Sequence, residues 1–264
     1  MKTILFDMDG TLTAHRRRIS QEMVKNVREL TRYHKVGILT GSKFEDIQRQ
    51  CGLIWDTIST APLDNLVLLP CNGTKVYTWG PGSTWKKSYD ISMKQELGTE
   101  LFRNLVQSVV KAQSVLYDSK TLGCIDIMPD FLDYRGSLLN WSPIGRSSEH
   151  GIREKFIKAD IEFNIRDHMI NLVKSFMCNK NETLDGVSLA KGGQTSVDIF
   201  PDGWDKTYAF NHFSKSECTF VGDACNPGQN DYEIFAALQG SASSFHVKSP
   251  HETLDIINNI LKEV

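Results

Sequence analysis

The stretch that decides the fold is Met1-Lys2-Thr3-Ile4-Leu5-Phe6-Asp7-Met8-Asp9-Gly10-Thr11-Leu12-Thr13. The apolar run from Ile4 to Phe6 is typical of a buried strand, and two aspartates follow where that strand should end. On an extended segment, Asp7 and Asp9 point to the same side and repel each other unless a cation lies between them. Mg²⁺ suits such a position because it is a hard cation that takes oxygen ligands. A carboxylate held in this way can attack phosphorus and form an aspartyl phosphate.

The turn after the aspartates is suited to phosphate. Gly10 permits a sharp turn, and the exposed amides and the Thr11 hydroxyl can hold phosphate oxygens. Asp-Gly is also a standard turn dipeptide, so a plain hairpin is the alternative. The motif resembles the opening D-x-D-G-T of the haloacid dehalogenase superfamily of phosphotransferases. That resemblance implies a small hydroxyl residue after a second strand, then a lysine, then a later acidic cluster for the metal.

A second strand and a lysine supply two of these pieces. The run Val36-Gly37-Ile38-Leu39 is β-prone and ends in Thr40-Gly41-Ser42. Ser42 and the neighbouring amides can bind phosphate at the strand tip, although the N-cap of an ordinary helix is the alternative for Ser42. Lys206 precedes an apolar segment suited to a helix, so its ammonium group can neutralise both a carboxylate and a phosphate. A solvated surface lysine is the alternative there.

The acidic cluster lies in the block Thr219-Phe220-Val221-Gly222-Asp223-Ala224-Cys225-Asn226-Pro227-Gly228-Gln229-Asn230-Asp231. This pattern gives a strand, an acid at its tip, a Gly/Pro loop and a second acid. We expect Asp223 and Asp231 to complete the Mg²⁺ shell begun by Asp7 and Asp9, directly or through water. Taken alone, the block also fits a polar turn, but the order of the motifs along the chain favours phosphoryl transfer.

Length and composition are those of an ordinary soluble globular protein. The chain has 264 residues, 40% hydrophobic and 23% charged, which suffices for one large or two medium domains. The formal net charge of −2 gives no reason to expect a nucleic-acid or membrane partner. No apolar stretch has the length of a bilayer-spanning helix, and the first residues do not resemble a signal peptide. The scattered cysteines form no C-x-x-C pair, so we expect reduced thiols, no zinc site and a cytoplasmic location.

Strand and helix patterns alternate along the first part of the chain. The spacing predicts a helix over 20–34 with Ser20 as its N-cap, a strand over 36–39, a helix over 44–50 and a strand over 66–69. This alternation is typical of an α/β fold with a doubly wound parallel sheet, which binds ligands at the carboxyl ends of its strands.

The alternation breaks near Gly80-Pro81-Gly82, where we expect a hinge into an inserted domain. The expected domains are a core over 1–82 and 201–264 and a cap over 83–200, with a second hinge at 201–203. Helices and hairpins are segregated within the inserted part, which predicts an α+β cap with an antiparallel sheet. The expected cap elements are helices over 94–112 and 160–173, strands over 131–134, 138–142, 186–189 and 195–200, and a polar loop over 178–185; a closing helix over 252–261 follows in the core.

The cap carries a second group of candidate residues. Arg135 and Arg146 stand at the two ends of a hairpin-like unit, and Arg153 follows shortly after. A cluster of guanidinium groups suits a second phosphate, because each planar fork binds phosphate oxygens bidentately. The alternative is a set of exposed arginines paired with nearby acids such as Asp133.

Three longer strings narrow the resemblance from superfamily to family. They are N-W-S-P-I-G-R-S from Asn140, G-G-Q-T-S-V-D-I-F-P-D-G-W-D-K from Gly192 to Lys206, and P-G-Q-N-D-Y-E-I-F from Pro227. They are similar to the eukaryotic-type α-phosphomannomutases, and the similarity runs through nearly the whole chain.

The resemblance implies an activity and its residues. Asp7 would be the nucleophile and Asp9 the general acid/base of an enzyme that interconverts mannose 6-phosphate and mannose 1-phosphate for GDP-mannose synthesis. A hexose 1,6-bisphosphate would be the intermediate and activator, and Mg²⁺ the cofactor. The implied substrate-binding residues are Arg135, Arg146 and Arg153 for the distal phosphate and Asn140, Ser196 and Asp198 for the sugar.

The chain departs from the family pattern near the expected site. Lys43 stands where the family usually has aspartate, which adds a positive charge near the phosphate mouth. Cys225 lies between Asp223 and Asp231, where it either lines the site or packs as a buried thiol. The remaining departures are Thr40 for glycine, Gly136 for asparagine, the pair Ala224-Cys225 for larger polar residues and Gln229 within a usual Gly-Gly.

Two rival functions share these motifs. With water as the acceptor, the same core gives a sugar-phosphate phosphatase, whereas the arginine cluster favours a bisphosphorylated intermediate. A binding or scaffold protein that kept the fold would have little reason to keep the acids and the lysine at the strand tips. The helix over 94–112 shows apolar residues on more than one side, which together with the resemblance predicts a homodimer joined through the cap.

Overall fold

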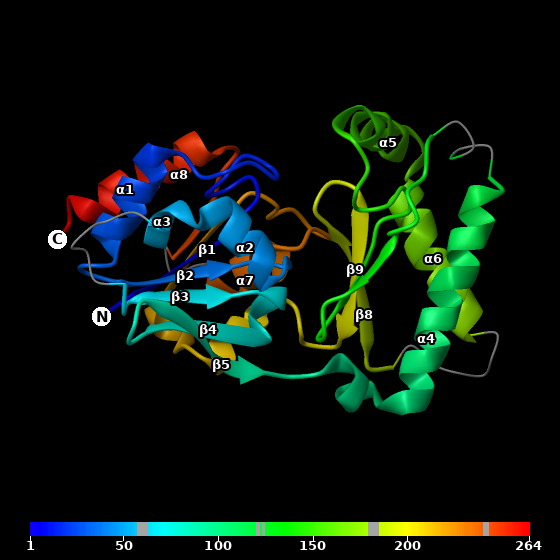
Figure 1. Cartoon of the computed structure of the whole chain (residues 1–264), viewed down its shortest axis with the longest axis horizontal. Helices are drawn as coiled ribbons and strands as arrows, with labels where there is room; N and C mark the ends of the chain where they lie inside the picture. The colour runs from blue at the N-terminus through cyan, green and yellow to red at the C-terminus, as the bar shows by residue number, and fades with distance from the viewer. Residues whose placement is uncertain (57–62, 120–121, 123–124, 179–184, 240–242) are drawn as a thin grey trace. The chain divides into compact units, whose positions relative to one another are not determined.

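The computed structural model describes residues 1–56, 63–119, 122, 125–178, 185–239 and 243–264. The chain divides into two compact units: a core formed by Met1–Asp90 and Trp204–Val264, and a cap formed by Ile91–Gly203 (Figure 1). Among the described residues, no helix is both long and apolar enough to cross a bilayer.

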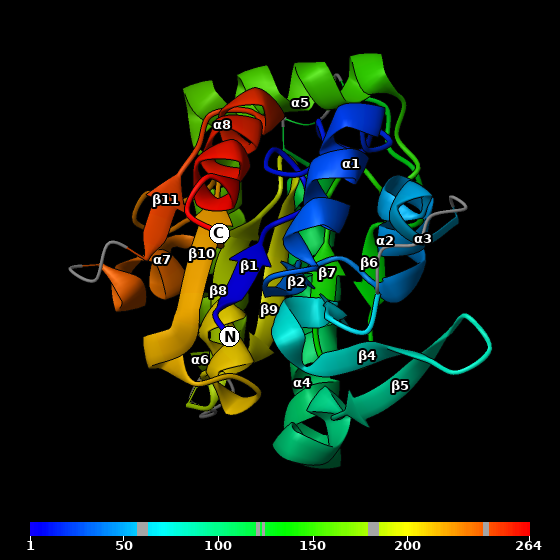
Figure 2. The ribbon, with the colours of Figure 1, turned by 90° about the vertical axis from the view of Figure 1, so that its left-hand side faces the viewer.

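The described part of the core contains a seven-stranded sheet with the order β11-β10-β1-β2-β3-β4-β5 (Figure 2). The strands from β11 to β3 pair in parallel, and β4 and β5 extend the sheet as an antiparallel hairpin. Their bounds are β1 Thr3–Phe6, β2 Lys35–Leu39, β3 Leu66–Leu69, β4 Lys75–Gly80, β5 Thr84–Asp90, β10 Cys218–Gly222 and β11 Ser244–His246.

Alternation within the central strands explains why both faces of this sheet are buried. Ile4 and Phe6 of β1 pack into one apolar cluster, which also contains Val27 of a covering helix. Leu5 points the other way, into a cluster that contains Ile234. The doubly wound α/β core that the sequence predicts is therefore confirmed.

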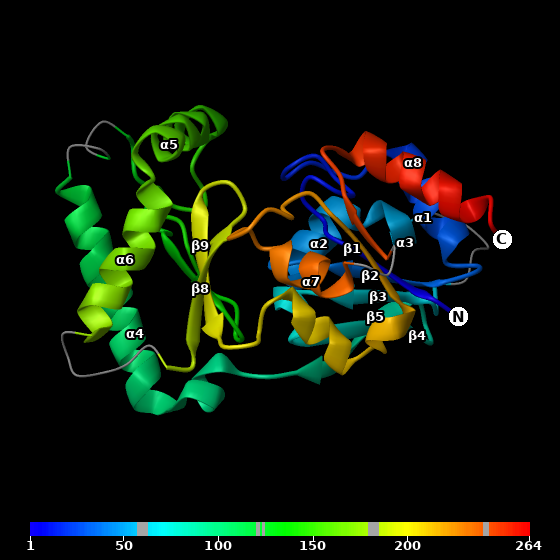
Figure 3. The ribbon, with the colours of Figure 1, turned by 180° about the vertical axis from the view of Figure 1, so that it is seen from behind.

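Helices cover the two faces of the core sheet. The helices α1 (Gln21–Leu30), α2 (Phe44–Cys51), α3 (Leu53–Asp56) and α8 (Pro250–Leu261) contribute to the first cluster, and α7 (Tyr232–Leu238) contributes to the second (Figure 3). Short 3₁₀ turns η1 (Cys71–Gly73), η2 (Lys206–Asn211) and η3 (Lys215–Glu217) complete the unit. Ser20 caps α1 as expected, since its hydroxyl accepts a hydrogen bond from the Met23 N–H at 3.1 Å.

The chain leaves the core later than the sequence indicates. Residues 81–83 form a turn between β4 and β5 and not a hinge, because β5 pairs with β4 from Thr84 to Asp90. The cap therefore begins at Ile91 in place of residue 83, and the core resumes at Trp204 in place of residue 201.

The described part of the cap contains a four-stranded antiparallel sheet with the order β6-β7-β9-β8. Leu139 and Trp141 of β7 and Val197 and Ile199 of β9 are buried on one face, which the helices α4 and α6 cover. The α+β cap is thus also as expected. Its elements are α4 Met93–Tyr117, β6 Leu132–Tyr134, β7 Leu139–Trp141, α5 His150–Phe163, α6 Ile165–Cys178, β8 Val187–Gly192 and β9 Ser196–Pro201.

The single helix expected over 160–173 is wrong, because two helices meet there. Asn164, in a left-handed conformation (φ 50°), ends α5, and α6 begins at the next residue. The Asp160 carboxylate closes this corner by accepting hydrogen bonds from the Arg166 N–H and Nε, both at 2.7 Å. Most of the polar loop expected over 178–185 lies outside the described residues.

Candidate active site

The candidate site of the core lies at the carboxyl ends of β1 and β10. The chain connects β1 to β2 on one side of the sheet and reaches β10 on the other, so a crevice is expected between the ends of β1 and β10. Asp7 follows β1, and Asp223 follows β10. The Asp7 N–H donates to the Val221 carbonyl at 2.9 Å, which continues the parallel ladder to this end.

Lys206 is fully buried between two of the acids. Its Nζ donates to the Oδ1 atoms of both Asp7 and Asp231. The second oxygen of Asp231 accepts a hydrogen bond from the Ala224 N–H at 3.0 Å. A surface position for Lys206 is therefore excluded, and Asp231 holds the lysine in place.

The turn η2 positions Lys206. The Asp205 side chain caps it by accepting from the Thr207 N–H at 2.7 Å. The Asn72 side chain donates to the Trp204 carbonyl at 3.2 Å. Asn72 therefore ties the tip of β3 to the segment that carries the lysine.

Burial and the charges of their neighbours shift the pKa values of Asp7, Asp223 and Lys206. Burial raises the pKa of Asp7 well above its ordinary value, and the Lys206 charge offsets part of that rise. Burial, followed by the charge of Asp231, raises the pKa of Asp223. Burial acts to lower the pKa of Lys206, but the charges of Asp231 and Asp7 outweigh burial and raise it.

This donor set fits a divalent metal ion. Asp7, Asp223 and Asp231 each offer a carboxylate oxygen, and these atoms lie within 4.8 Å of one another. Three carboxylates around one ammonium group leave an excess of negative charge when all are ionised. Mg²⁺, a hard cation with a preference for oxygen, suits such a site.

Asp9 is not one of the three acids in this group, and its part in metal binding beside Asp7 stays a prediction. The strand β1 ends at Phe6, so the period of two in an extended strand does not reach Asp9. The Asp9 Oδ1 accepts a hydrogen bond from the Arg16 N–H at 2.6 Å, and Gln50 lies on its other side. Asp9 is half-buried, whereas Asp7 is buried.

The turn after Asp9 is shaped for close packing against Asp223. Gly10 has a φ of +92°, and a β-carbon there would lie 2.3 Å from the Asp223 Oδ2. The Thr11 hydroxyl is buried and has no hydrogen-bond partner among the described residues. A buried hydroxyl without a protein partner fits the expectation that it meets a ligand oxygen.

The loop after β2 is tied to the loop after β3. The Ser42 N–H donates to the Thr40 hydroxyl at 3.2 Å, and the Thr40 carbonyl accepts from the Asn72 N–H at 2.9 Å. The N-cap residue of α2 is Lys43 and not Ser42, and Lys43 makes no side-chain capping bond. Capping thus does not explain the Ser42 hydroxyl, and its phosphate role stays a prediction.

Cys225 is a buried thiol close to the acidic group, since the charges of Asp231, Lys206 and Asp223 all act on it. Its Sγ lies 3.4 Å from the Gly222 carbonyl, and burial raises its pKa. A thiol in this state is a small apolar residue and a weak nucleophile.

The cap presents its polar residues on the sheet face opposite α4 and α6. Asn140 of β7 is paired in register with Asp198 of β9. The Asn140 Nδ2 donates to the Asp198 Oδ1 at 2.6 Å and to the Ser196 Oγ at 2.9 Å. All three side chains are buried, and Ser196 and Asp198 share a face as their spacing predicts.

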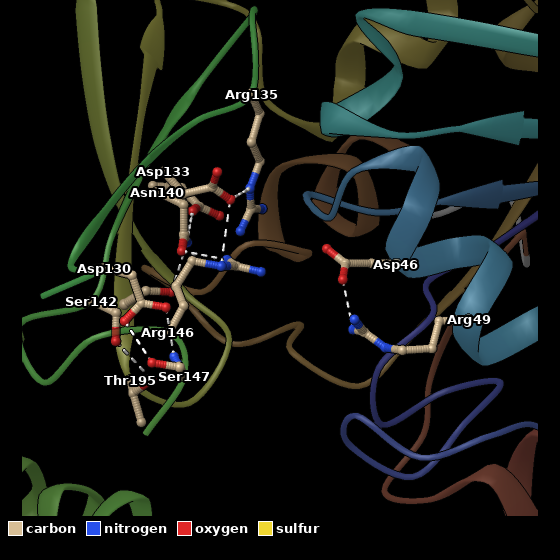
Figure 4. Close-up of polar contacts among 12 residues, drawn as sticks. Asp46, Arg49, Asp130, Asp133, Arg135, Asn140, Ser142, Arg146, Ser147 and Thr195 are labelled. Atoms are coloured by element: carbon tan, nitrogen blue, oxygen red, sulfur yellow. Dashed lines mark hydrogen bonds and ion pairs between the residues drawn. The ribbon is translucent and has the colours of Figure 1, made fainter. Parts of the chain in front are cut away.

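The structure joins two of the arginines to this row (Figure 4). The Arg146 Nη1 donates to the Asn140 Oδ1 at 2.8 Å. The Nε atoms of Arg135 and Arg146 lie 3.1 Å and 3.4 Å from the Asp133 Oδ2. Arg153 comes from α5 and donates to the Thr195 hydroxyl at 3.1 Å.

Sequence reasoning left Thr195 and Arg16 without a role and named Asp133 only as a pairing partner. Asp133 lies in β6 and Arg135 directly follows the end of that strand, where its Nε meets the Asp133 Oδ2. Thr195 precedes Ser196, and its hydroxyl lies 3.3 Å from the Ser142 hydroxyl. The positive φ of Arg16 (59°) has no sequence pattern that would reveal it.

The core sheet and the inserted cap form a haloacid dehalogenase-like fold. A haloacid dehalogenase-like hydrolase from Bacteroides thetaiotaomicron is similar over 98% of this chain and 99% of its own, with a TM-score of 0.55 at 14% identity. The N-terminal truncated, IMP-bound IMP-nucleotidase of Plasmodium falciparum matches over 99% of this chain and 68% of its own, with a TM-score of 0.68 at 13% identity. These likenesses support the fold.

The family follows from sequence. The model of the family described as eukaryotic phosphomannomutase matches residues 21–263, so the chain belongs to that family. Phosphomannomutase 2 of Dictyostelium discoideum is 34% identical over 97% of this chain and 94% of its own length. The phosphomannomutase of Spinacia oleracea is 32% identical over 95% of this chain and 92% of its own length. The phosphomannomutase of Encephalitozoon cuniculi is 30% identical over 100% of this chain and 95% of its own length.

Proposed function

We propose that this protein is a phosphomannomutase that interconverts mannose 6-phosphate and mannose 1-phosphate. The observation that carries the proposal is the buried Asp7–Lys206–Asp231 group in a chain of the phosphomannomutase family. Family membership favours the mutase over a sugar-phosphate phosphatase.

Asp7 is the nucleophile in this proposal. Its carboxylate attacks a phosphorus of hexose 1,6-bisphosphate, the bond from phosphorus to the sugar oxygen breaks, and an aspartyl phosphate remains. The 6-hydroxyl of mannose 1-phosphate then takes the phosphoryl group from Asp7, which frees the carboxylate and gives mannose 1,6-bisphosphate. This bisphosphate reorients, Asp7 attacks its 1-phosphate, and mannose 6-phosphate leaves while the aspartyl phosphate forms again. Lys206 holds the Asp7 carboxylate and neutralises charge that develops on the phosphoryl oxygens.

Asp9 is the proposed general acid and base. Its hydrogen bond from the Arg16 N–H fixes the carboxylate, while partial exposure leaves it open to proton exchange with a sugar hydroxyl. This role agrees with its position outside the group that surrounds Lys206.

Asp7 and Asp223 are the acids that would hold Mg²⁺ directly. Both oxygens of Asp231 already accept hydrogen bonds, from Lys206 and from the Ala224 N–H, so its contribution is through water. When bound, Mg²⁺ supplies positive charge that stabilises the transferring phosphoryl group. Ser42 and Thr11 add hydroxyls for phosphate oxygens at the same strand ends.

The cap residues are proposed to hold the substrate. Arg135, Arg146 and Arg153 grip the phosphate that is not reacting, and a grip on a distal phosphate serves both the 1- and the 6-phosphate. Asn140, Ser196 and Asp198 supply hydrogen bonds to sugar hydroxyls from one face of the cap sheet.

Activator dependence tests the function. With mannose 1-phosphate and Mg²⁺, turnover should require catalytic hexose 1,6-bisphosphate, and acid quenching should trap a phosphoryl group on the peptide that contains Asp7. Turnover that is independent of the bisphosphate would support the phosphatase instead.

We also propose a cytoplasmic homodimer joined through the cap. On α4, Leu105 and Val109 are buried, but Leu101 and Phe102 are half-buried and Val110 is 48% exposed. A second copy would cover these residues. Sedimentation at micromolar concentration tests this, with Leu101→Glu expected to split the dimer and a wild-type monomer contradicting it.

A further inference from the structure

We propose that Asp133 is a positioning residue that holds Arg135 and Arg146 together as one phosphate grip. The proposal deepens the function proposed above and rests on it for the assignment of the two arginines. Asp133 itself is not expected to touch the substrate.

One oxygen atom joins the two arginines. The Oδ2 of Asp133 lies 3.1 Å from the Arg135 Nε and 3.4 Å from the Arg146 Nε (Figure 4). Because both contacts use Nε, each guanidinium is held by its edge nearest the side-chain stem. Two neighbouring cations repel each other, and a shared carboxylate offsets that repulsion.

The fold fixes Asp133 in this place. Asp133 of β6 is paired in register with Asn140 of β7, which is paired in register with Asp198 of β9. The three residues therefore form a row across the sheet. Arg146 contacts two members of the row, since its Nε faces Asp133 and its Nη1 donates to Asn140. Its guanidinium is thus fixed in both position and rotation.

Burial makes the pairing important for Arg135. The Arg135 side chain is only 4% exposed, and the Asp133 side chain is 16% exposed. A guanidinium this deeply buried needs a partner of opposite charge. With Asp133 replaced by a neutral residue, Arg135 should move toward solvent and leave the position that suits a phosphate.

The negative charge of Asp133 also acts against phosphate binding, in contrast to its positioning of the two arginines. A carboxylate beside a phosphate site repels the incoming phosphate, so its removal alone would tighten binding. The sign of the change in affinity therefore separates a positioning residue from a mere competitor of phosphate.

The test compares Asp133→Asn with a matched control. Asp167→Asn removes the same charge from an ion pair in the same unit, because Asp167 of α6 pairs with Lys191 of β8 at 2.7 Å. Lys191 is in register with Val197, so this pair lies on the opposite face of the cap sheet. Calorimetry with mannose 1-phosphate and with inorganic phosphate gives the affinities, and kinetics gives KM and kcat.

We expect Asp133→Asn to raise the dissociation constant and KM for mannose 1-phosphate by about tenfold or more, because small misplacements of binding groups are costly. The value of kcat should change far less, and Asp167→Asn should change neither quantity. Asp133→Glu keeps the charge and should bind mannose 1-phosphate more tightly than Asp133→Asn does. If the Asn variant is unstable, the Glu variant compared with wild type still tests the positioning role.

Unchanged or tighter binding by Asp133→Asn would overturn the proposal. So would a wild-type protein that binds neither phosphate probe. A wild-type protein that binds mannose 1-phosphate but does not interconvert the two phosphates would contradict the proposed function, and the calorimetric comparison would still decide the role of Asp133.

Discussion

Gly10 and Asp223 come from distant parts of the chain and lie so close that residue 10 has no room for a side chain. A β-carbon at position 10 would lie 2.3 Å from the Asp223 Oδ2. Gly10→Ala should therefore displace Asp223 and raise the Mg²⁺ concentration needed for half-maximal activity. The strained φ of +92° adds about 1–3 kcal/mol of destabilisation, which urea unfolding would measure.

Gly82→Ala is the matched control for this substitution. Gly82 has a φ of +83°, but apart from Gly82 and its two chain neighbours no heavy atom of the described residues lies within 4 Å of the position of its β-carbon. The Gly82→Ala variant should have a lower free energy of unfolding, but the Mg²⁺ concentration that gives half-maximal activity should not change. Equal Mg²⁺ dependence of both variants would contradict the role given to Asp223.

Lys206→Met should lose activity and destabilise the core by about 3–5 kcal/mol, because it leaves two buried carboxylates without their cation. Lys191→Met, which breaks the more exposed pair with Asp167, should cost about 0–1 kcal/mol. Urea unfolding of both variants at neutral pH gives the comparison. Similar losses would mean that the burial of Lys206 has no energetic consequence.

His34 makes stability depend on pH. Both ring nitrogens are buried and have no hydrogen-bond partner among the described residues. Burial, together with the positive charges of Lys2 and the amino terminus, lowers the pKa of His34. Between the lowered pKa and the unfolded pKa of about 6.5, the unfolded state binds more protons, so stability falls as pH drops below about 6.5.

Replacement of His34 by Phe should flatten this part of the pH dependence. The side chain of His251 is 85% exposed, so His251→Gln should leave the profile unchanged. Denaturant unfolding between about pH 5 and pH 8 gives both profiles, on either side of the ordinary histidine pKa. The His34 assignment fails if the slope below pH 6.5 survives in the Phe variant.

The sequence predicts the strand ends well, because short apolar runs such as Leu66–Leu69 and Ile4–Phe6 stop where polar motifs begin. Period-two spacing likewise places Ser196 and Asp198 on one face. These features depend on local patterns. The period-two argument for Asp9 applies strand geometry beyond Phe6, where β1 ends, so the role of Asp9 beside Asp7 stays a prediction.

Long-range contacts could not be predicted in this way. The burial of Lys206 depends on Asp7, 199 residues away in the sequence. The sharing of Asp133 by two arginines depends on the position of the loop that carries Arg146, which no local pattern specifies. The corner at Asn164 is set by the pair of Asp160 with Arg166, and helical periodicity alone continues through it.

Arg146→Ala should weaken binding of mannose 1-phosphate by about 2–5 kcal/mol, as for a charge that loses its partner in a desolvated site. Turnover of acetyl phosphate should be spared, since this small donor has no distal phosphate. Arg32→Ala, at an exposed pair with Glu29, should change neither reaction. Equal losses toward both substrates in Arg146→Ala would contradict the distal grip.

In the proposed function, Asp7 transfers a phosphoryl group between the two ends of a hexose. Phosphorus NMR of the purified protein with mannose 1-phosphate, Mg²⁺ and catalytic hexose 1,6-bisphosphate tests this transfer most directly. We expect a growing mannose 6-phosphate resonance with little free phosphate. We also expect no conversion by Asp7→Asn, and conversion slowed by about 10²- to 10⁴-fold in Asp9→Asn. Free phosphate as the main product, or conversion that persists in Asp7→Asn, would contradict the proposed function.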